Sequence, residues 1–65
     1  MACNTKPNIA NPDDFYANLL RLHEGLDDAE SMKASCRLIL LLANHIGDQD
    51  ILDDAVRLAR QAGRN

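Results

Sequence analysis

The sequence predicts an all-α protein in which three helices form an up-down-up unit. Three helix starts are marked by residues that favour the N-cap position, namely Asn11, Asp27 and Asp48. Apolar residues between these positions recur at intervals of three and four, and no segment alternates with the period of two that a strand requires. The segments that join the helices are only two or three residues long, which favours antiparallel neighbours.

The length and composition limit the chain to one small domain and exclude several classes of function. A chain of 65 residues buries only about 60% of its unfolded surface, so its hydrophobic core is marginal. The net charge of −3 and the aromatic content of 3% argue against a nucleic-acid partner, which would require a basic field and stacking side chains. No apolar run approaches the roughly 18 residues of a membrane span, so we expect no membrane partner.

We expect residues 1–10 to form a flexible N-terminal arm and residues 11–65 to form the three-helix domain. The arm shows no periodicity, and it lacks the apolar region of a signal peptide. Two cysteines, Cys3 and Cys36, are too few for the disulfide framework of a small secreted domain. These features predict a reduced, cytoplasmic protein.

The first helix is predicted from about residue 12 to residue 24. Asn11 is a suitable N-cap, Pro12 suits the first helical position, and Gly25 can adopt the left-handed conformation that ends a helix. At 100° per residue, its apolar residues form two adjacent lines. The first line contains Phe15, Leu19, Leu22 and Leu26, and the second contains Tyr16, Leu20 and His23.

The second helix is predicted over residues 28–46. Asp27 is its N-cap, Glu30 stands three residues later as in a capping box, and Gly47 ends the helix. This helix is apolar nearly all round, which is typical of a helix that is buried nearly all round. We expect the flanking helices to cover the side that carries Met32, Cys36, Ile39 and Ala43, with Cys36 as a buried small hydrophobe. The leucines on the other side, Leu38, Leu41 and Leu42, then need another chain, so the unit is expected to assemble into a larger helical bundle.

The third helix is predicted over residues 49–62, after Asp48 and before Gly63. Its apolar residues again form two lines. The first line contains Ile51, Ala55, Leu58 and Ala62, and the second contains Leu52, Val56 and Ala59.

The sequence contains no motif of a catalytic, cofactor-binding or metal-binding site. Neither His23 nor His45 has a second ligand at the spacing that zinc sites use, and His45 is explained as a structural residue near a helix C-terminus. Nothing marks Cys36 or a serine as a nucleophile with an adjacent base. A helical unit of this size also lacks room for a pocket of about 300 Å³ beside its core. We therefore expect a protein that is not an enzyme and binds no cofactor.

Three segments carry a resemblance to a known family. They are Pro-Asn-Ile-Ala-Asn-Pro-Asp-Asp-Phe-Tyr, His-Glu-Gly-Leu and, most specifically, Leu-Leu-Ala-Asn-His-Ile-Gly-Asp at residues 41–48. The chain, from about Pro7 to Arg60, resembles a family of short bacterial proteins catalogued as a domain of unknown function. Members of this family often lie beside flavin-dependent monooxygenases in catabolic gene clusters. The resemblance implies an accessory subunit and supplies neither an activity nor functional residues.

Two hypotheses for the function follow. The first is a non-catalytic protein-interaction module, either a homodimer or the accessory small subunit of a bacterial flavin-dependent enzyme. Its interface would contain Leu38, Leu41, Leu42, His45, Tyr16, Leu20, Leu52 and Val56. The alternative is a regulatory protein that binds a small ligand or a metal through His45, Asn44 and His23.

Overall fold

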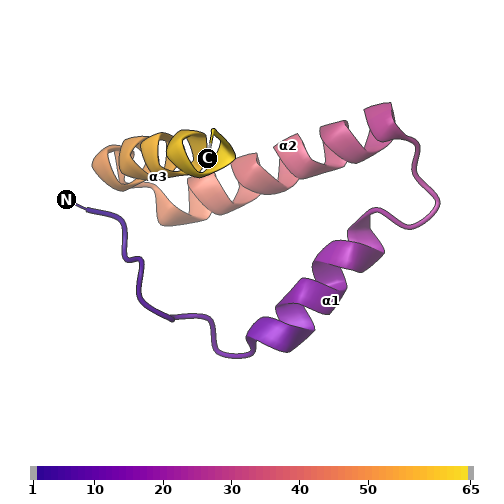
Figure 1. Cartoon of the computed structure of the whole chain (residues 1–65), viewed down its shortest axis with the longest axis horizontal. Coiled ribbons are helices and arrows are strands. Elements are labelled where there is room, and N and C mark those ends of the chain that lie inside the picture. The colour runs from indigo at the N-terminus through magenta and orange to yellow at the C-terminus, as the bar shows by residue number, and fades with distance from the viewer. Residues whose placement is uncertain (1, 65) are drawn as a thin grey trace.

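The computed structural model describes residues 2–64 and contains three α-helices. Helix α1 spans Pro12–Leu22, α2 spans Asp28–Ile46 and α3 spans Gln49–Gly63. No strand occurs within these described residues, so the prediction of an all-α three-helix fold is confirmed. Figure 1 shows that a short turn joins α1 to one end of α2 and that α3 turns back from the other end of α2.

The three predicted N-caps are confirmed. Asn11, Asp27 and Asp48 each accept a hydrogen bond from the backbone N–H three residues later, which satisfies a donor that the first helical turn leaves unpaired. At α2 the capping box is complete. The N–H of Glu30 donates to the Asp27 carboxylate at 2.8 Å, and the N–H of Asp27 donates to the Glu30 carboxylate at 3.1 Å.

Two of the three helix ends differ from the prediction. Helix α1 ends at Leu22 rather than at residue 24, because the last turn is tightened by hydrogen bonds between residues three apart. Gly25, with a φ of 74°, lies in the turn that follows. Gly47 ends α2 in the left-handed conformation as predicted, whereas Gly63 lies inside α3, which continues one residue past the predicted end at residue 62.

The helices do not close into a compact bundle. In Figure 1, α1 diverges from α2 instead of packing along it. The radius of gyration is 13.3 Å, whereas a compact chain of this length has a value of about 11 Å. Among the residues that the structure describes, none is fully buried, so the chain by itself has no closed core.

The half-buried apolar residues of α1 and α3 show which face of each outer helix points inward. In α1 they include Leu19 and Leu22, and in α3 they include Ile51, Ala55 and Leu58. These residues belong to the first of the two apolar lines predicted in each helix. In the second lines His23 and Leu52 are also half-buried, whereas the remaining members are exposed: Tyr16, Leu20, Val56 and Ala59.

The face of α2 that the chain covers is not the one predicted. The half-buried residues Ser31, Ala34, Ser35 and Leu38 lie together on one side of the helix, although Leu38 was expected to be uncovered. Three of these four side chains are small. A count of apolar side chains favours the other side of α2, because it gives no weight to the two serines.

The side of α2 that carries Met32 was expected to be covered by the other two helices, and this prediction is also wrong. The side chains of Met32 and Ile39 are 70% and 63% exposed, and Cys36 is exposed as well. Cys36 is therefore not the buried small hydrophobe that its apolar neighbours suggested. Both Cys36 and Cys3 are free thiols.

Residues 2–11 contain no helix, and the first of them lie against α3. The backbone N–H of Cys3 donates a hydrogen bond of 2.9 Å to the carboxylate of Asp54 in α3. Figure 1 accordingly shows the start of the chain beside α3 rather than beside α1. The segment thus connects the two outer helices by a route separate from α2.

Candidate functional site

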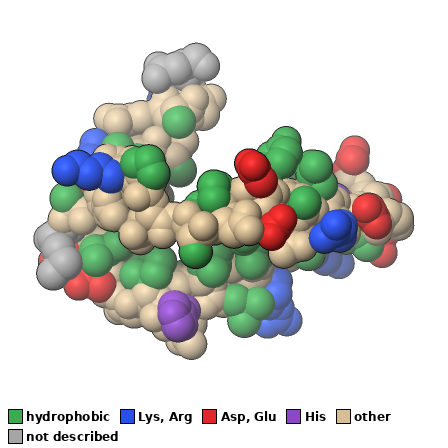
Figure 2. Space-filling model, turned by 90° about the horizontal axis from the view of Figure 1, so that it is seen from below, with side chains coloured by type: hydrophobic (Ala, Val, Ile, Leu, Met, Phe, Trp, Pro, Cys, Tyr) green, Lys and Arg blue, Asp and Glu red, His purple; other side chains and the backbone are tan. Residues whose placement is uncertain are grey.

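The most prominent surface feature is a group of exposed apolar side chains on α2. At one side of the helix, Met32, Ile39 and Ile46 are all more than half exposed. Figure 2 shows hydrophobic side chains along much of the face seen from below, with acidic and basic groups between them. Exposed apolar residues gathered on one side of a helix are typical of an interface.

The structure leaves most of the predicted interface residues accessible. Leu41 and Leu42 of α2 are exposed, as is His45. The exposed members on the outer helices are Tyr16, Leu20 and Val56. Leu38 and Leu52 are half-buried within the chain. At 100° per residue Leu41 lies opposite Met32, so α2 exposes apolar side chains in two directions.

The solvent-accessible area of the chain is far larger than that of a compact monomer of the same mass. The chain exposes 5887 Å², whereas a compact monomer of 7.2 kDa exposes about 4,100 Å². The difference is about 1,800 Å² per chain, more than the roughly 800 Å² that each partner buries in a standard protein–protein interface. The surplus is thus large enough for at least one stable interface.

The residues of the alternative hypothesis are not brought together. His23 lies in the turn before α2, whereas Asn44 and His45 lie in the last turns of that helix. A helix of 19 residues is about 28 Å long, so the two histidines lie near opposite ends of α2. Within residues 2–64, no three His, Cys, Asp or Glu side chains are grouped so as to hold a metal ion.

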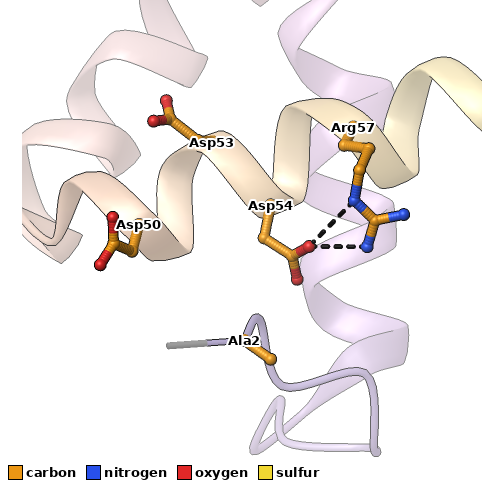
Figure 3. Close-up of a pocket in the computed structure, with 5 residues that line it drawn as sticks. All are labelled: Ala2, Asp50, Asp53, Asp54 and Arg57. Carbon is orange, nitrogen blue, oxygen red and sulfur yellow. Dashed lines mark hydrogen bonds and ion pairs between the residues drawn. The ribbon is translucent and has the colours of Figure 1, made fainter.

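A hollow on α3 gathers acidic side chains next to the N-terminal segment. Figure 3 shows the residues that line it, which are Ala2, Asp50, Asp53, Asp54 and Arg57. Arg57 forms an ion pair of 2.7 Å with Asp54, and the second oxygen of Asp54 accepts the hydrogen bond from Cys3. These two contacts hold the pKa of the Asp54 carboxyl below its ordinary value, the Cys3 hydrogen bond being the larger cause.

The contacts of Asp54 explain the acidic hollow as a structural feature. The carboxylate joins the N-terminal segment to α3 and is itself held by an arginine one turn away. This link could not be predicted from the sequence, because nothing in the spacing of Cys3 and Asp54 indicates that they meet.

A membrane-spanning helix would need a longer and more apolar stretch than any helix within residues 2–64 provides.

The chain belongs to the family described as "Protein of unknown function (DUF2783)", whose model matches residues 3–61. This match confirms the resemblance to a domain of unknown function. No curated protein and no solved structure matches the chain. The family description names no activity.

Proposed function

We propose that this member of the DUF2783 family is a non-catalytic protein-interaction module, which buries the exposed apolar surface of α2 against another protein chain. The observation that carries the proposal is the surplus of accessible area, about 1,800 Å² per chain. A dimer that buried this surplus on both chains would remove about 3,600 Å², which falls within the range of obligate homodimers.

The energetics of a small domain favour the same conclusion. A core of this size rarely supplies more than about 3–5 kcal/mol of stability. Each leucine or isoleucine that becomes buried contributes about 1.5–3 kcal/mol. Burying Ile39 and Ile46 in an interface would therefore contribute about 3–6 kcal/mol, which is comparable to the whole stability of a domain this small.

The non-catalytic part of the proposal is supported by the polar contacts. Side-chain hydrogen bonds join carboxylates, amides and arginines within single helices or turns, for example Arg21 to Asn18 and Gln49 to Asp53. The carboxylate with a shifted pKa, that of Asp54, is used to hold the N-terminal segment. Contacts of this kind support a structural role for these side chains.

The proposal has two forms, which differ in the identity of the partner. The pure protein is proposed to form a homodimer, since two-fold pairing is the commonest oligomeric arrangement. In a bacterial cytoplasm, the module is proposed to serve as the accessory small subunit of a flavin-dependent catabolic enzyme. The family resemblance supports the second form, and the surplus of accessible area supports both.

The oligomeric state of the pure chain in solution tests the proposal. Light scattering and analytical ultracentrifugation at tens of micromolar should give a particle of about twice the 7.2 kDa chain mass. A fully helical particle of 7.2 kDa at this concentration would show that the open three-helix unit is stable alone, and it would overturn the proposal. Circular dichroism on the same samples provides the helical content.

A further inference from the structure

One side of α2 carries a seven-residue repeat. We define the α2 seam as the six residues that follow one another at alternating intervals of three and four: Ala29, Met32, Cys36, Ile39, Ala43 and Ile46. This is the spacing at which apolar residues form the contact line of a coiled coil. Small side chains (Ala, Cys, Ala) alternate with large ones (Met, Ile, Ile) along the seam.

The seam is open to a partner. All its residues are exposed except Ala43, which is half-buried. At 100° per residue, the middle of the seam lies roughly 120° around the helix from Leu38, which belongs to the face that the chain itself covers. The other two helices of the same chain therefore leave this line of side chains free for another helix.

We propose that the α2 seam pairs with the α2 seam of a second copy of this chain, antiparallel about a two-fold axis. In the proposed register, the axis passes between Arg37 and Leu38, at the middle of α2. Each small residue then faces a large one of the second copy. Ala29 lies opposite Ile46, Met32 lies opposite Ala43, and Cys36 lies opposite Ile39.

The alternation of small and large residues selects this arrangement over a parallel one. In a parallel pair Ala43 would face Ala43 and Ile39 would face Ile39, so that layers with voids would alternate with crowded layers. In the antiparallel pair, every layer combines one small and one large side chain, as a well-packed core requires. Small residues in every layer also permit a separation near 8 Å, the lower end of the usual range between helix axes.

The register also uses the whole of α2. Because the axis lies at the middle of the helix, both copies overlap over their full length, and each N-terminus lies beside the oppositely charged C-terminal end of the other helix. This inference rests on the proposed function, since it identifies a second copy as the partner. Leu41, which is opposite Met32 on the helix, stays outside the seam and remains available to a different protein.

Disulfide cross-linking between two separately made chains tests the register. Both chains carry Cys3→Ser and Cys36→Ser; one also carries Met32→Cys and the other Ala43→Cys. Mixed and oxidised, they should form a covalent heterodimer, because positions 32 and 43 face each other. Neither chain alone should cross-link, since two copies of the same position lie about 16 Å apart along the axis.

Two charge variants provide a second measurement. Ile39→Asp places a carboxylate in the seam and should convert the dimer to a monomer. Leu41→Asp is the matched control, because Leu41 is 62% exposed, close to the 63% of Ile39, yet it lies away from the seam. It should leave the dimer intact. Circular dichroism shows whether each variant keeps its helices.

The outcomes separate the inference from the proposed function. A monomeric parent chain would overturn both. A dimeric parent whose mixed variants do not cross-link between positions 32 and 43, or whose Met32→Cys chain cross-links with itself, would overturn the antiparallel register alone. Loss of the dimer in Leu41→Asp but not in Ile39→Asp would move the interface to the other side of α2.

Discussion

The backbone N–H of Cys3 donates a hydrogen bond of 2.9 Å to the carboxylate of Asp54, which lies 51 residues further along the chain. The contact attaches the N-terminal segment to α3, and Arg57 holds the same carboxylate from the next turn of the helix. A carboxylate that accepts hydrogen bonds from two donors is stabilised in its charged form, so the pKa of Asp54 is lowered.

The link between Cys3 and Asp54 should depend on pH in a defined direction. The pKa of Asp54 is lower in the folded chain than its ordinary value of 3.8, so the link is present above that value and is lost as the pH falls through the lowered pKa. The amide resonance of Cys3 in NMR spectra should therefore stay constant from pH 7 to pH 5 and shift only in more acidic solution.

Two variants connect this shift to the contact with Asp54. Asp54→Ala should give the released position of the Cys3 resonance already at pH 7. Asp53→Asn is the control, because Asp53 accepts a hydrogen bond from Gln49 within α3 and none from the N-terminal segment. A Cys3 resonance that is unchanged in Asp54→Ala would show that the segment is held by other contacts.

The capping box of α2 gives a prediction for stability. Asp27→Ala removes the acceptor for the N–H of Glu30 and should lower the free energy of unfolding by about 1 kcal/mol, as measured by urea denaturation. Asp28→Ala is the matched control, since Asp28 lies in the first turn and interacts mainly with the helix dipole. Equal losses of unfolding free energy in the two variants would show that the hydrogen bonds of the capping box add nothing to the effect of a negative charge near the helix N-terminus.

The helix starts could be predicted from the sequence because a cap is a local interaction. Asn11, Asp27 and Asp48 each bond a backbone group only three residues away, so neighbouring residues decide the geometry. The end of α2 at Gly47 could be predicted for the same reason, because the left-handed turn there is also local. The end of α1 was predicted two residues too late, because the sequence does not reveal that its last turn is tightened by hydrogen bonds between residues three apart.

The covered face of α2 could not be predicted in the same way. A helix that is apolar on two sides offers its neighbours two nearly equivalent surfaces, and the choice depends on how the chain turns at both ends. Counting apolar residues favoured the side with Met32, whereas the structure covers the side with Ser31 and Ser35. The apolar residues from Met32 to Ile46 also follow the three-and-four spacing of a coiled-coil contact line, which favours leaving that side open for another helix.

The glycine at the end of α2 and the one at the end of α3 should respond differently to substitution. Gly47 has a φ of 74°, so Gly47→Ala places a side chain in the left-handed region and should cost about 1–2 kcal/mol of unfolding free energy. Gly63 lies within α3 and has open space around it, so Gly63→Ala should be neutral or slightly stabilising. Thermal denaturation of both variants measures the difference, and equal effects would contradict the left-handed turn.

The separation of the histidines gives a prediction about metal ions. His23 and His45 lie near opposite ends of a helix that is about 28 Å long, so one ion cannot bind both within a chain. Calorimetric titration with Zn²⁺ should show no stoichiometric binding, and elemental analysis of the purified protein should show no metal. One metal ion per chain that is lost in His45→Ala would support the alternative function as a metal-binding regulator.

The strongest test of an incomplete core is the dependence of stability on protein concentration. If a second chain completes the core, folding and association are linked, and the melting temperature must rise with concentration. A hundredfold increase corresponds to about 2.7 kcal/mol per dimer, which for two chains of this length is a rise of about 10 °C. Circular dichroism from about 5 to 500 micromolar covers this range.

The Ile39→Asp variant, which places a charge in the α2 seam, should have a lower melting temperature that hardly changes over this range of concentrations. A parent chain that melts at one temperature over the whole range would mean that the open arrangement of α1, α2 and α3 is stable alone, and that its exposed leucines and isoleucines do not contribute to the stability of a dimer.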